Sequence, residues 1–513
     1  MGVIGGGTAG YFAALALVRA FPGLRVTLVE SSAVPIIGVG EATTTLMPPF
    51  LHQQLGLDIV ELFRAVRPTF KLGIKFEWGP REPPWFAFPF GDAWPVDAFV
   101  HDGDLRRQSL TSVLMRDDRA PIVRGPEGAL LSLLPSLKFA YHLENRSFVQ
   151  FLTLAASRAG IEHVDATIES AVVGADGDIE VLRADDGREL RFDLYVDATG
   201  FRSLLLEKAL GSKFTSYASS LFCDRAVVAA LPRAGRVGPY TTAETMDAGW
   251  CWRIPVGDED HRGYVFASAF LDEDRAVAEM RSRNPGMVEA SLVRFRSGRH
   301  GDFWLRNVVA VGNAYGFVEP LESTALHMVI VELAYLLEGL RLWRDEGQRS
   351  VAYTARASQA VGEHWDYLRW FLAIHYRFNE RLDTPFWRAA RADVDVSGVS
   401  DALARFRAEG TFTVAGASPL GGADPGFRAD LGATTLLLGQ RAEGCAVARA
   451  AIERRDWEAL VSRHEGLAAR ALDHGEALDA LLATPRMVEE LVSSPTSWLH
   501  REGRLPAELA RAS

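Results

Sequence analysis

The sequence predicts an α/β fold in two parts, a Rossmann-like nucleotide-binding module followed by a mainly helical C-terminal region. Three observations support this prediction. A short apolar run leads directly into a glycine-rich turn and an Ala- and Leu-rich segment within residues 1–20. Two later apolar segments, 194–200 and 308–314, end in turns, as parallel strands of such a sheet do. Residues 320–400 and 430–510 show helical apolar spacing with abundant Ala, Leu, Glu and Arg.

The glycine-rich turn is the first chemical motif. Residues 5–10 read G-G-G-T-A-G, which places G-x-G-x-x-G between an expected strand and an expected helix over residues 11–20. A second strand is expected over residues 24–29, and Glu30 follows it. Glycines let a pyrophosphate approach the helix N-terminus, and the acid can bind a ribose hydroxyl. This βαβ unit predicts dinucleotide binding at Gly5, Gly6, Gly7, Gly10 and Glu30.

The two later strands favour FAD over NAD as the dinucleotide. Residues 194–200 end in D-A-T-G, and residues 308–312 lead into Gly312-Asn313-Ala314. Each could be an ordinary parallel strand with a turn, but returns to the nucleotide sheet after long excursions are typical of two-part flavoproteins. We therefore expect an FAD-binding module with interleaved substrate-side strands over residues 1–330. Residues 331–513 are expected to form a mainly helical region that completes the substrate site.

Composition and charge exclude several other classes. The 513 residues, 48% of them hydrophobic, are enough for two or three packed units. A net charge of -11 argues against nucleic-acid binding, because phosphates require clustered Lys and Arg. Cys223, Cys251 and Cys445 have no paired spacing, so we expect neither disulfides nor a metal site. Charges interrupt the apolar stretch 324–343, and no signal-peptide pattern precedes the first glycines, so we expect a cytoplasmic protein without a membrane span.

Residues 250–255 read W-C-W-R-I-P and hold two indoles in a short stretch. One interpretation is a buried strand with two core tryptophans. The other is that Trp250 and Trp252 lie beside a flavin, where they take up the space that an organic substrate would otherwise occupy. The motif alone leaves both interpretations open.

Residues 69–78 alternate between apolar and polar side chains, which predicts a single strand. Lys71 and Lys75 then share one face of this strand. A lysine on a half-buried strand is usually solvated, and a catalytic role is the alternative.

Residues 316–325 combine a loop with the start of a helix. Pro320 punctuates the loop, and Ser323 or Thr324 is expected to cap the helix that follows. In the simpler interpretation, Glu322 is an acid that favours the positive end of this helix. In the sharper one, the N–H groups of Thr324 and Ala325 form a small anion site beside a flavin, with Glu322 as a nearby base.

Taken together, these motifs resemble the flavin-dependent tryptophan halogenases. The similar segments occur in the family's order at residues 5–10, 38–43 (G-V-G-E-A-T), 70–76 (F-K-L-G-I-K-F), 250–255, 317–324, 375–376 (H-Y) and 383–387 (D-T-P-F-W). The resemblance implies an enzyme that receives FADH2 from a separate NAD(P)H-dependent flavin reductase. With O2 and chloride or bromide, such an enzyme forms hypohalous acid and halogenates an electron-rich aromatic ring.

The resemblance also implies roles for single residues. Lys71 would hold the oxidised halogen as a haloamine or by a hydrogen bond, and Glu322 would accept the ring proton or stabilise positive charge, with Ser323 in support. An internal route to a fixed cation suits hypohalous acid, which must be confined. The choice of Lys71 rather than Lys75 rests on the motif match.

Halide, flavin and flavin-shielding positions follow from the same match. Halide would bind near Thr324 and Ala325, and Trp250 and Trp252 would keep the organic substrate away from the flavin. The implied flavin contacts are Gly6, Ala9, Ser31, Val34, Ile37, Glu41, Ala42, Ile168, Asn313 and Leu326.

Departures from the family pattern concern mainly the substrate. The family's P-x-x-S-x-G ends here in Ala325, which keeps the backbone N–H and loses glycine's freedom at positive φ. Residues 410–416 and 421–426 lack the Tyr- and Trp-rich segment that grips the amino acid in free-tryptophan enzymes, which argues against free tryptophan as substrate. Phe88 and Phe90 could instead sandwich an aromatic ring. We rank indole-type arenes first, either free or tethered to a carrier or peptide.

Two other functional classes remain as alternatives. One is an FAD monooxygenase or reductase of the same fold, in which activated oxygen is transferred to the substrate directly. The other is a non-catalytic flavoprotein that binds a carrier or partner protein. Either a monomer or a homodimer is compatible with the sequence.

Overall fold

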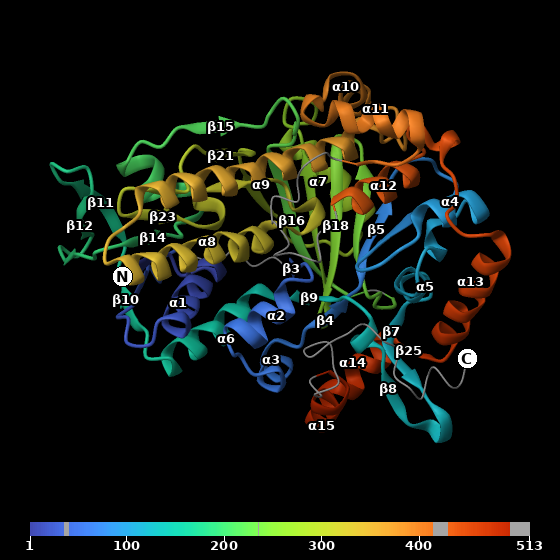
Figure 1. Cartoon of the computed structure of the whole chain (residues 1–513), viewed down its shortest axis with the longest axis horizontal. Coiled ribbons are helices and arrows are strands. Elements are labelled where there is room, and N and C mark those ends of the chain that lie inside the picture. The colour runs from blue at the N-terminus through green and yellow to red at the C-terminus, as the bar shows by residue number, and fades with distance from the viewer. Residues whose placement is uncertain (35–39, 234, 414–428, 493–513) are drawn as a thin grey trace.

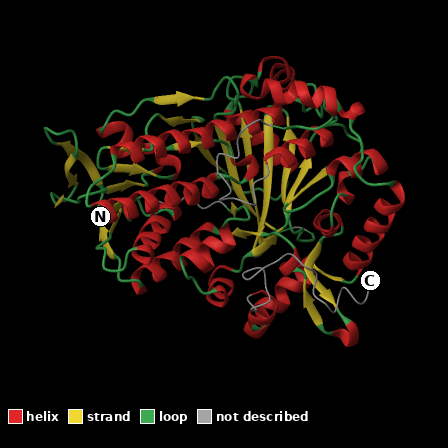
Figure 2. Cartoon of the chain, viewed as in Figure 1, coloured by secondary structure: helices red, strands yellow, loops and turns green. Residues whose placement is uncertain are grey.

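The structure is a computed structural model that describes residues 1–34, 40–233, 235–413 and 429–492. Two sheets form its centre, and helices lie around them (Figures 1 and 2). The long helices α8 (Ala325–Glu346) and α9 (Val351–Arg377) pack against each other over these sheets (Figure 1). The predicted α/β class and the helical C-terminal region are confirmed.

The nucleotide-binding sheet has six strands, and all but the last are parallel. Helix α1 (Thr8–Ala20) follows the first strand and packs on α6 (Asn145–Arg158) and α8. The second strand begins at Thr27, three residues later than predicted. In spatial order the strands are β10 (Glu162–Asp165), β2 (Thr27–Glu30), β1 (Gly2–Ile4), β14 (Tyr195–Asp197), β23 (Val308–Ala310) and β22 (Trp304–Leu305).

The second large sheet has seven strands and carries the tryptophan motif on a central strand. Neighbouring strands are antiparallel, except β5 and β17, which are parallel. In order they are β20 (Ser291–Arg294), β16 (Arg225–Pro232), β19 (Glu259–Phe266), β18 (Gly249–Val256), β17 (Thr241–Met246), β5 (Gly73–Glu77) and β6 (Phe86–Pro89).

The single strand predicted over residues 69–78 is wrong, because the chain changes sheets at Leu72. Its N–H donates to the Pro239 carbonyl, and its own carbonyl accepts from the Phe90 N–H. The first half, β4 (Thr69–Lys71), pairs with β9 (Ala140–Leu143), which also pairs with β3 (Glu41–Ala42). The second half is β5 of the seven-stranded sheet. Lys71 and Lys75 therefore lie in different sheets.

Smaller elements complete the fold. The small strands are β7 (Arg119–Arg124), β8 (Leu130–Ser132), β11 (Ile168–Val173), β12 (Ile179–Ala184), β13 (Glu189–Leu190), β15 (Phe214–Ser216), β21 (Gly298–His300), β24 (Gly316–Phe317) and β25 (Ala471–Asp473). The other helices are α2 (Met47–Pro49), α3 (Ile59–Val66), α4 (Pro95–Asp102), α5 (Leu110–Arg116), α7 (Glu273–Arg283), α10 (Pro385–Asp393), α11 (Ser400–Glu409), α12 (Ala429–Gly439), α13 (Arg454–Ala469), α14 (His474–Ala483) and α15 (Pro485–Met487). Within the described ranges, no helix combines the length and apolar character that a membrane crossing requires.

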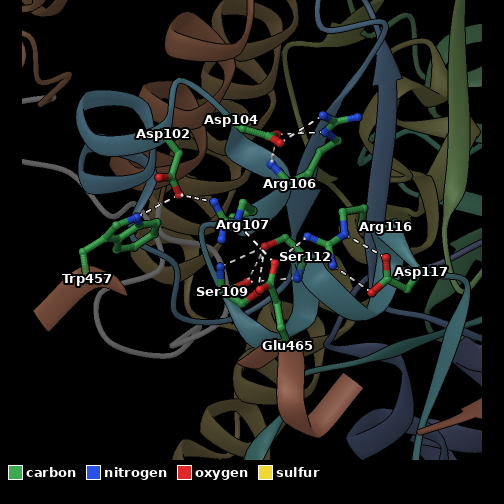
Figure 3. Close-up of polar contacts among 10 residues, drawn as sticks. All are labelled: Asp102, Asp104, Arg106, Arg107, Ser109, Ser112, Arg116, Asp117, Trp457 and Glu465. Carbon is green, nitrogen blue, oxygen red and sulfur yellow. Dashed lines mark hydrogen bonds and ion pairs between the residues drawn. The ribbon is translucent and has the colours of Figure 1, made fainter. Parts of the chain in front are cut away.

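A polar network attaches the C-terminal helix α13 to α4 and α5 (Figure 3). The Trp457 indole N–H donates to Asp102 at 2.8 Å, and Glu465 lies 3.0 Å from Arg116 and 3.4 Å from Arg107. Strand β25 adds to the same attachment by pairing with β7. Segments that are 355 positions apart in the sequence, at Asp102 and Trp457, therefore form one packed unit here. Helix α8 continues across position 330. The division of the chain there, into a flavin-binding part and a part that completes the substrate site, therefore stays a proposal about function.

Candidate functional site

A pocket of about 460 Å³ opens at the carboxyl ends of the parallel strands. The described residues that we predicted to contact flavin lie on its wall, with one exception, and their contact with flavin stays a prediction. Ile37 is outside the described residues. The wall residues are Gly5, Gly6, Gly7, Ala9, Glu30, Ser31, Val34, Glu41, Ala42, Ile168, Asn313 and Leu326.

The exception is Gly10, which does not line the pocket. A Cβ at this position would stand 1.8 Å from the Gly5 carbonyl oxygen. Gly10 therefore allows helix α1 to pack closely on the turn before it, which is the packing role of the last glycine in this motif.

The first turn of the pocket fits a dinucleotide. Gly7 is the N-cap of helix α1 and provides no side-chain cap, and a Cβ placed on it would meet no atom within 4 Å. The first N–H groups of the helix can therefore receive a pyrophosphate. A Cβ on Gly6 would overlap the Glu30 carboxylate at 1.4 Å. Tyr11 and His163 contact that carboxylate at 3.0 and 2.6 Å and hold it at the end of β2. These residues could bind the pyrophosphate and ribose of FAD.

The far side of the pocket is formed by the loop before α8. Pro320, Ser323, Ala325 and Leu326 line it, together with Trp252 of β18. The residue of this loop with left-handed backbone is Ser323, whose φ is 58°. Helix α8 begins at Ala325, so alanine is already helical at the position where the family has glycine.

The predicted capping of α8 by Ser323 or Thr324 is wrong. Neither side chain caps the helix, and the buried Thr324 Oγ1 finds no hydrogen-bond partner in the described part of the chain. The Ser323 hydroxyl is oriented toward Lys71 instead and accepts a hydrogen bond from its Nζ at 2.7 Å. The N-terminus of α8 therefore offers backbone N–H groups and one unpaired hydroxyl, a donor set that suits a small anion.

Lys71 is fully buried, contrary to the usual solvated lysine of such a strand. Burial lowers the pKa of its ammonium group to about 7, although the nearby Glu322 carboxylate raises it. The Nζ lies 5.3 Å from the centre of the Phe90 ring. Lys75, by contrast, pairs with Glu77 at 2.9 Å on a partly exposed surface. Of the two lysines, Lys71 is the one held away from water, and its environment favours a neutral amine near pH 7.

The strand that carries Lys71 is fixed by buried hydrogen bonds. The Thr69 hydroxyl donates to the Pro255 carbonyl at 3.0 Å and so must accept from His142 Nδ1 at 2.8 Å. His142 Nε2 then accepts from the Thr241 hydroxyl at 2.9 Å. Burial holds the pKa of His142 well below its usual range, so this ring stays neutral beside Lys71. The network connects β4 with β17 and with the end of the tryptophan motif.

Glu322 is buried and contacts His375 of helix α9. The distance between Glu322 Oε1 and His375 Nε2 is 2.6 Å. His375 belongs to a family-like segment of the sequence, but a histidine inside a helical pattern carries no sign of its distant partner, so the sequence gives it no role.

The two tryptophans of the motif have different environments. Trp252 lines the pocket, and its indole N–H has no partner among the described residues. The Trp250 N–H donates at 2.8 Å to Glu319, which also accepts from the Tyr376 hydroxyl. Burial raises the pKa of Glu319 to about 7, although these two hydrogen bonds lower it. Both tryptophans are core residues of a buried strand, as the simpler interpretation predicted, and one of them also borders the pocket.

Phe88 and Phe90 lie outside the wall of this pocket. Phe88 packs edge-on against Phe76 at 5.8 Å and lies 6.4 Å from Phe371 of α9, while Phe90 lies beside Lys71. Phe76 and Phe371 also contact His375, the partner of Glu322, so both Phe88 and Phe90 lie near Lys71 and Glu322. The sandwich of an aromatic ring between Phe88 and Phe90 stays a prediction. Residues 414–428, which include most of the segment compared with free-tryptophan enzymes, lie outside the described residues.

Solved structures with this fold give the class of the protein. BrvH, a flavin-dependent halogenase from Brevundimonas sp. BAL3, matches with a TM-score of 0.80 at 29% identity, over 94% of this chain and 99% of BrvH. MibH, a lathipeptide tryptophan 5-halogenase, matches with a TM-score of 0.86 at 47% identity, over 100% of this chain and 98% of MibH. The fold and the site together define a flavin-dependent halogenase.

Sequence comparisons identify the family. A family model for tryptophan halogenase matches residues 1–418, and the chain belongs to this family. Tryptophan 7-halogenase RebH of Lentzea aerocolonigenes is 32% identical over 441 residues, 79% of this chain and 81% of RebH. The 7-chloro-L-tryptophan 6-halogenase KtzR of Kutzneria sp. (strain 744) is 35% identical over 443 residues, 79% of this chain and 84% of KtzR. Membership implies a flavin, a halide, an aromatic substrate and a separate flavin reductase.

Proposed function

We propose that the protein is an FADH2-dependent halogenase that uses O2 and chloride or bromide to halogenate the indole of a tryptophan carried in a peptide. The observation that carries this proposal is the position of Ser323. Ser323 lines the pocket proposed for the flavin, and its hydroxyl accepts a hydrogen bond from Lys71, which lies near Glu322. Ser323 therefore links the pocket, where the oxidant would form, to a buried amine.

The flavin and the halide would bind at different parts of the pocket. FADH2 would be held by the first turn, Glu30 and the wall residues of the pocket, and together with O2 it would supply the oxidation of halide to hypohalous acid. Halide would lie at the N-terminus of α8. There the first backbone N–H groups have no side-chain cap, and Thr324 Oγ1 has no hydrogen-bond partner among the described residues. Trp252 borders this space and would keep an aromatic ring away from the flavin.

Lys71 and Glu322 would carry out the transfer to the substrate. A neutral amine can attack hypohalous acid, which forms a haloamine and water, whereas a protonated amine can only hold the acid by a hydrogen bond. The lowered pKa of Lys71 makes the neutral form available near pH 7. Glu322 would receive the proton that leaves the ring. Because both groups are buried, the reactive halogen stays away from water until the ring is in place.

The nature of the substrate is supported by two observations. MibH, similar over the whole of this chain, is a lathipeptide tryptophan 5-halogenase. The sequence also lacks the aromatic segment of the free-tryptophan enzymes in residues 410–416 and 421–426. A peptide would supply the binding contacts that this segment provides for the free amino acid. The mainly helical region after residue 330 would complete the substrate site.

The test is product analysis by mass spectrometry. The protein is incubated with FAD, a flavin reductase, NADH, O2 and either halide, with free tryptophan, indole, and linear and cyclised tryptophan-containing peptides as substrates. We expect a halogenated peptide and little halogenated free tryptophan. Halogenation of free tryptophan alone would overturn the choice of a peptide. Hydroxylated products, or oxidised NADH without any halogenated product on the panel, would overturn the halogenase proposal.

A further inference from the structure

His375 and Glu322 form the most deeply buried acid and base pair near the site. His375 lies on α9 and is fully buried, and the Glu322 side chain is 4% exposed. They are 53 positions apart in the sequence, and their polar atoms approach to 2.6 Å. A contact this short inside the protein requires a proton between the two atoms, because a lone pair and a carboxylate oxygen would repel each other.

The hydrogen bond on the other side of the ring fixes the tautomer. His375 Nδ1 lies 2.8 Å from the Phe371 carbonyl oxygen, which can only accept, so Nδ1 carries a hydrogen. Two states remain for the pair. Either Nε2 is also protonated and donates to an ionised Glu322, or Glu322 is protonated and donates to a bare Nε2. Both states hold one proton on the contact, and both leave the buried pair with no net charge.

Aromatic rings hold His375 in this orientation. The centres of the Phe76, Trp78 and Phe371 rings lie 5.4, 5.9 and 5.1 Å from the centre of its imidazole. Three neighbours at such distances leave the ring little room to rotate, so Nε2 stays directed at Glu322. Other ionisable groups nearby are Lys71 on β4, which Glu322 influences, and Glu319 and Tyr376, which bond each other.

We propose that His375 and Glu322 share one proton and act as a single acid–base unit, in which His375 is the positioning residue for the carboxylate. This inference rests on the proposed function, since the proton received is the one that the halogenated ring carbon loses. The C–H bond breaks, its electron pair restores the aromatic ring, and an O–H bond forms at Glu322 Oε2. If the shared proton began on Oε1, it moves to Nε2. Both starting states therefore pass through a protonated Glu322 beside an imidazolium, and the extra proton goes to the Lys71 nitrogen, whose bond to the halogen has broken, so that the free amine is restored and no net proton is released.

The first test measures the shared proton without any flavin or turnover. Side-chain ¹⁵N NMR of histidine-labelled protein gives the protonation of both ring nitrogens of His375, whose signals are assigned by their loss in H375Q. We expect Nε2 to report a shared or bound proton from pH 6 to 8 in the wild type. In E322Q the uncharged amide can no longer balance a buried imidazolium, so the ring should become neutral, with a bare Nε2 that accepts from the amide N–H. Identical neutral patterns in both proteins, with no strongly deshielded proton at the contact between His375 and Glu322 in the wild type, would overturn the shared proton.

The second test separates positioning from space filling. H375F keeps the ring shape and removes the hydrogen bond, whereas H375Q retains an N–H that can reach Glu322. We expect kcat for halogenation to fall about 10- to 100-fold in H375F, with KM and the affinity for FAD unchanged, and to recover partly in H375Q. H364F is the matched control, because it makes the same buried change on the same helix and should keep wild-type kcat.

The outcomes distinguish this inference from the proposed function. Equal kcat in H375F and wild type would show that the ring only fills space, and would overturn the positioning role. An equal loss in H375F and H375Q would also overturn it, because the donated hydrogen bond would then be irrelevant. If wild-type protein halogenates no substrate, the proposed function fails, and the NMR result decides the shared proton by itself.

Discussion

Two clusters of charged residues in this molecule differ mainly in what surrounds them. In the site, the side chains of Lys71, Glu322 and His375 are at most 5% exposed. In the network on α4, α5 and α13 (Figure 3), Arg107, Arg116 and Glu465 have side chains that are 33, 25 and 38% exposed. Distances between partners are similar in the two clusters, but burial lowers the pKa of Lys71 to about 7 in the first, whereas the hydrogen bond to Asp117 raises the pKa of Arg116 in the second.

The difference shows that burial rather than charge pairing makes these groups chemically useful. Water screens the ions of the α13 network, so each pair contributes little and attaches a helix. In the site, burial lowers the pKa of Lys71 to about 7, so a neutral amine is present at ordinary pH and can be a nucleophile. The two clusters should therefore respond differently to substitution, pH and salt.

The largest expected effect is that of removing Lys71. K71A should lower the rate of product formation by at least about 100-fold, because the group that presents the halogen is lost. K75A should keep most of the wild-type rate, since Lys75 pairs with Glu77 on the surface. Mass spectrometry of the products from both variants, with flavin binding as a check on folding, makes the comparison. A similar loss in both would show that burial does not distinguish the two lysines.

The pH dependence of the transfer step should follow Lys71. Because its pKa is lowered to about 7, the neutral fraction rises with pH through that value. Product formation at saturating flavin should then rise about tenfold between pH 6 and pH 8 and level off above it. A solvated lysine would still be rising at pH 9 and above. Rates of single-turnover reactions across this range decide between the two, and a flat profile would contradict a catalytic amine.

A moderate effect is expected where a buried carboxylate loses one donor. W250F removes the N–H that Glu319 accepts, which should lower the free energy of unfolding by about 1–3 kcal/mol. W252F makes the same change on the same strand, but that N–H has no partner within the described ranges, so its cost should be smaller. Chemical denaturation of both variants measures the difference. Equal losses would mean that the hydrogen bond to Glu319 adds nothing.

The smallest effect belongs to the exposed network. E465Q removes one charge between Arg107 and Arg116, each of which keeps a second acidic partner, Asp102 or Asp117. The free energy of unfolding should fall by about 0.2–1 kcal/mol at low salt, and the loss should largely vanish in 1 M NaCl. Urea denaturation at the two salt concentrations checks this. A large loss that salt does not change would show that the network behaves like the buried site.

Much of the fold could be predicted because its signals are local. The glycine turn specified the strand, the turn and α1, since each requires particular residues at adjacent positions. The spacing of apolar residues likewise indicated the helical region after residue 320. The alternation over residues 69–78 misled the prediction, because it cannot show that Leu72 bonds to two different segments and passes the chain between sheets.

The sequence by itself determined the α/β class, the glycine-rich turn and the list of reactive side chains. Tertiary structure alone decided which of two lysines is buried, that Ser323 bonds Lys71 instead of capping a helix, and that His375 meets Glu322. Residue patterns report geometry over a few positions. Desolvation and the choice of hydrogen-bond partner depend on segments that become neighbours only when the chain folds. Glu322 and His375 are 53 positions apart, and Lys71 and Ser323 are 252 positions apart.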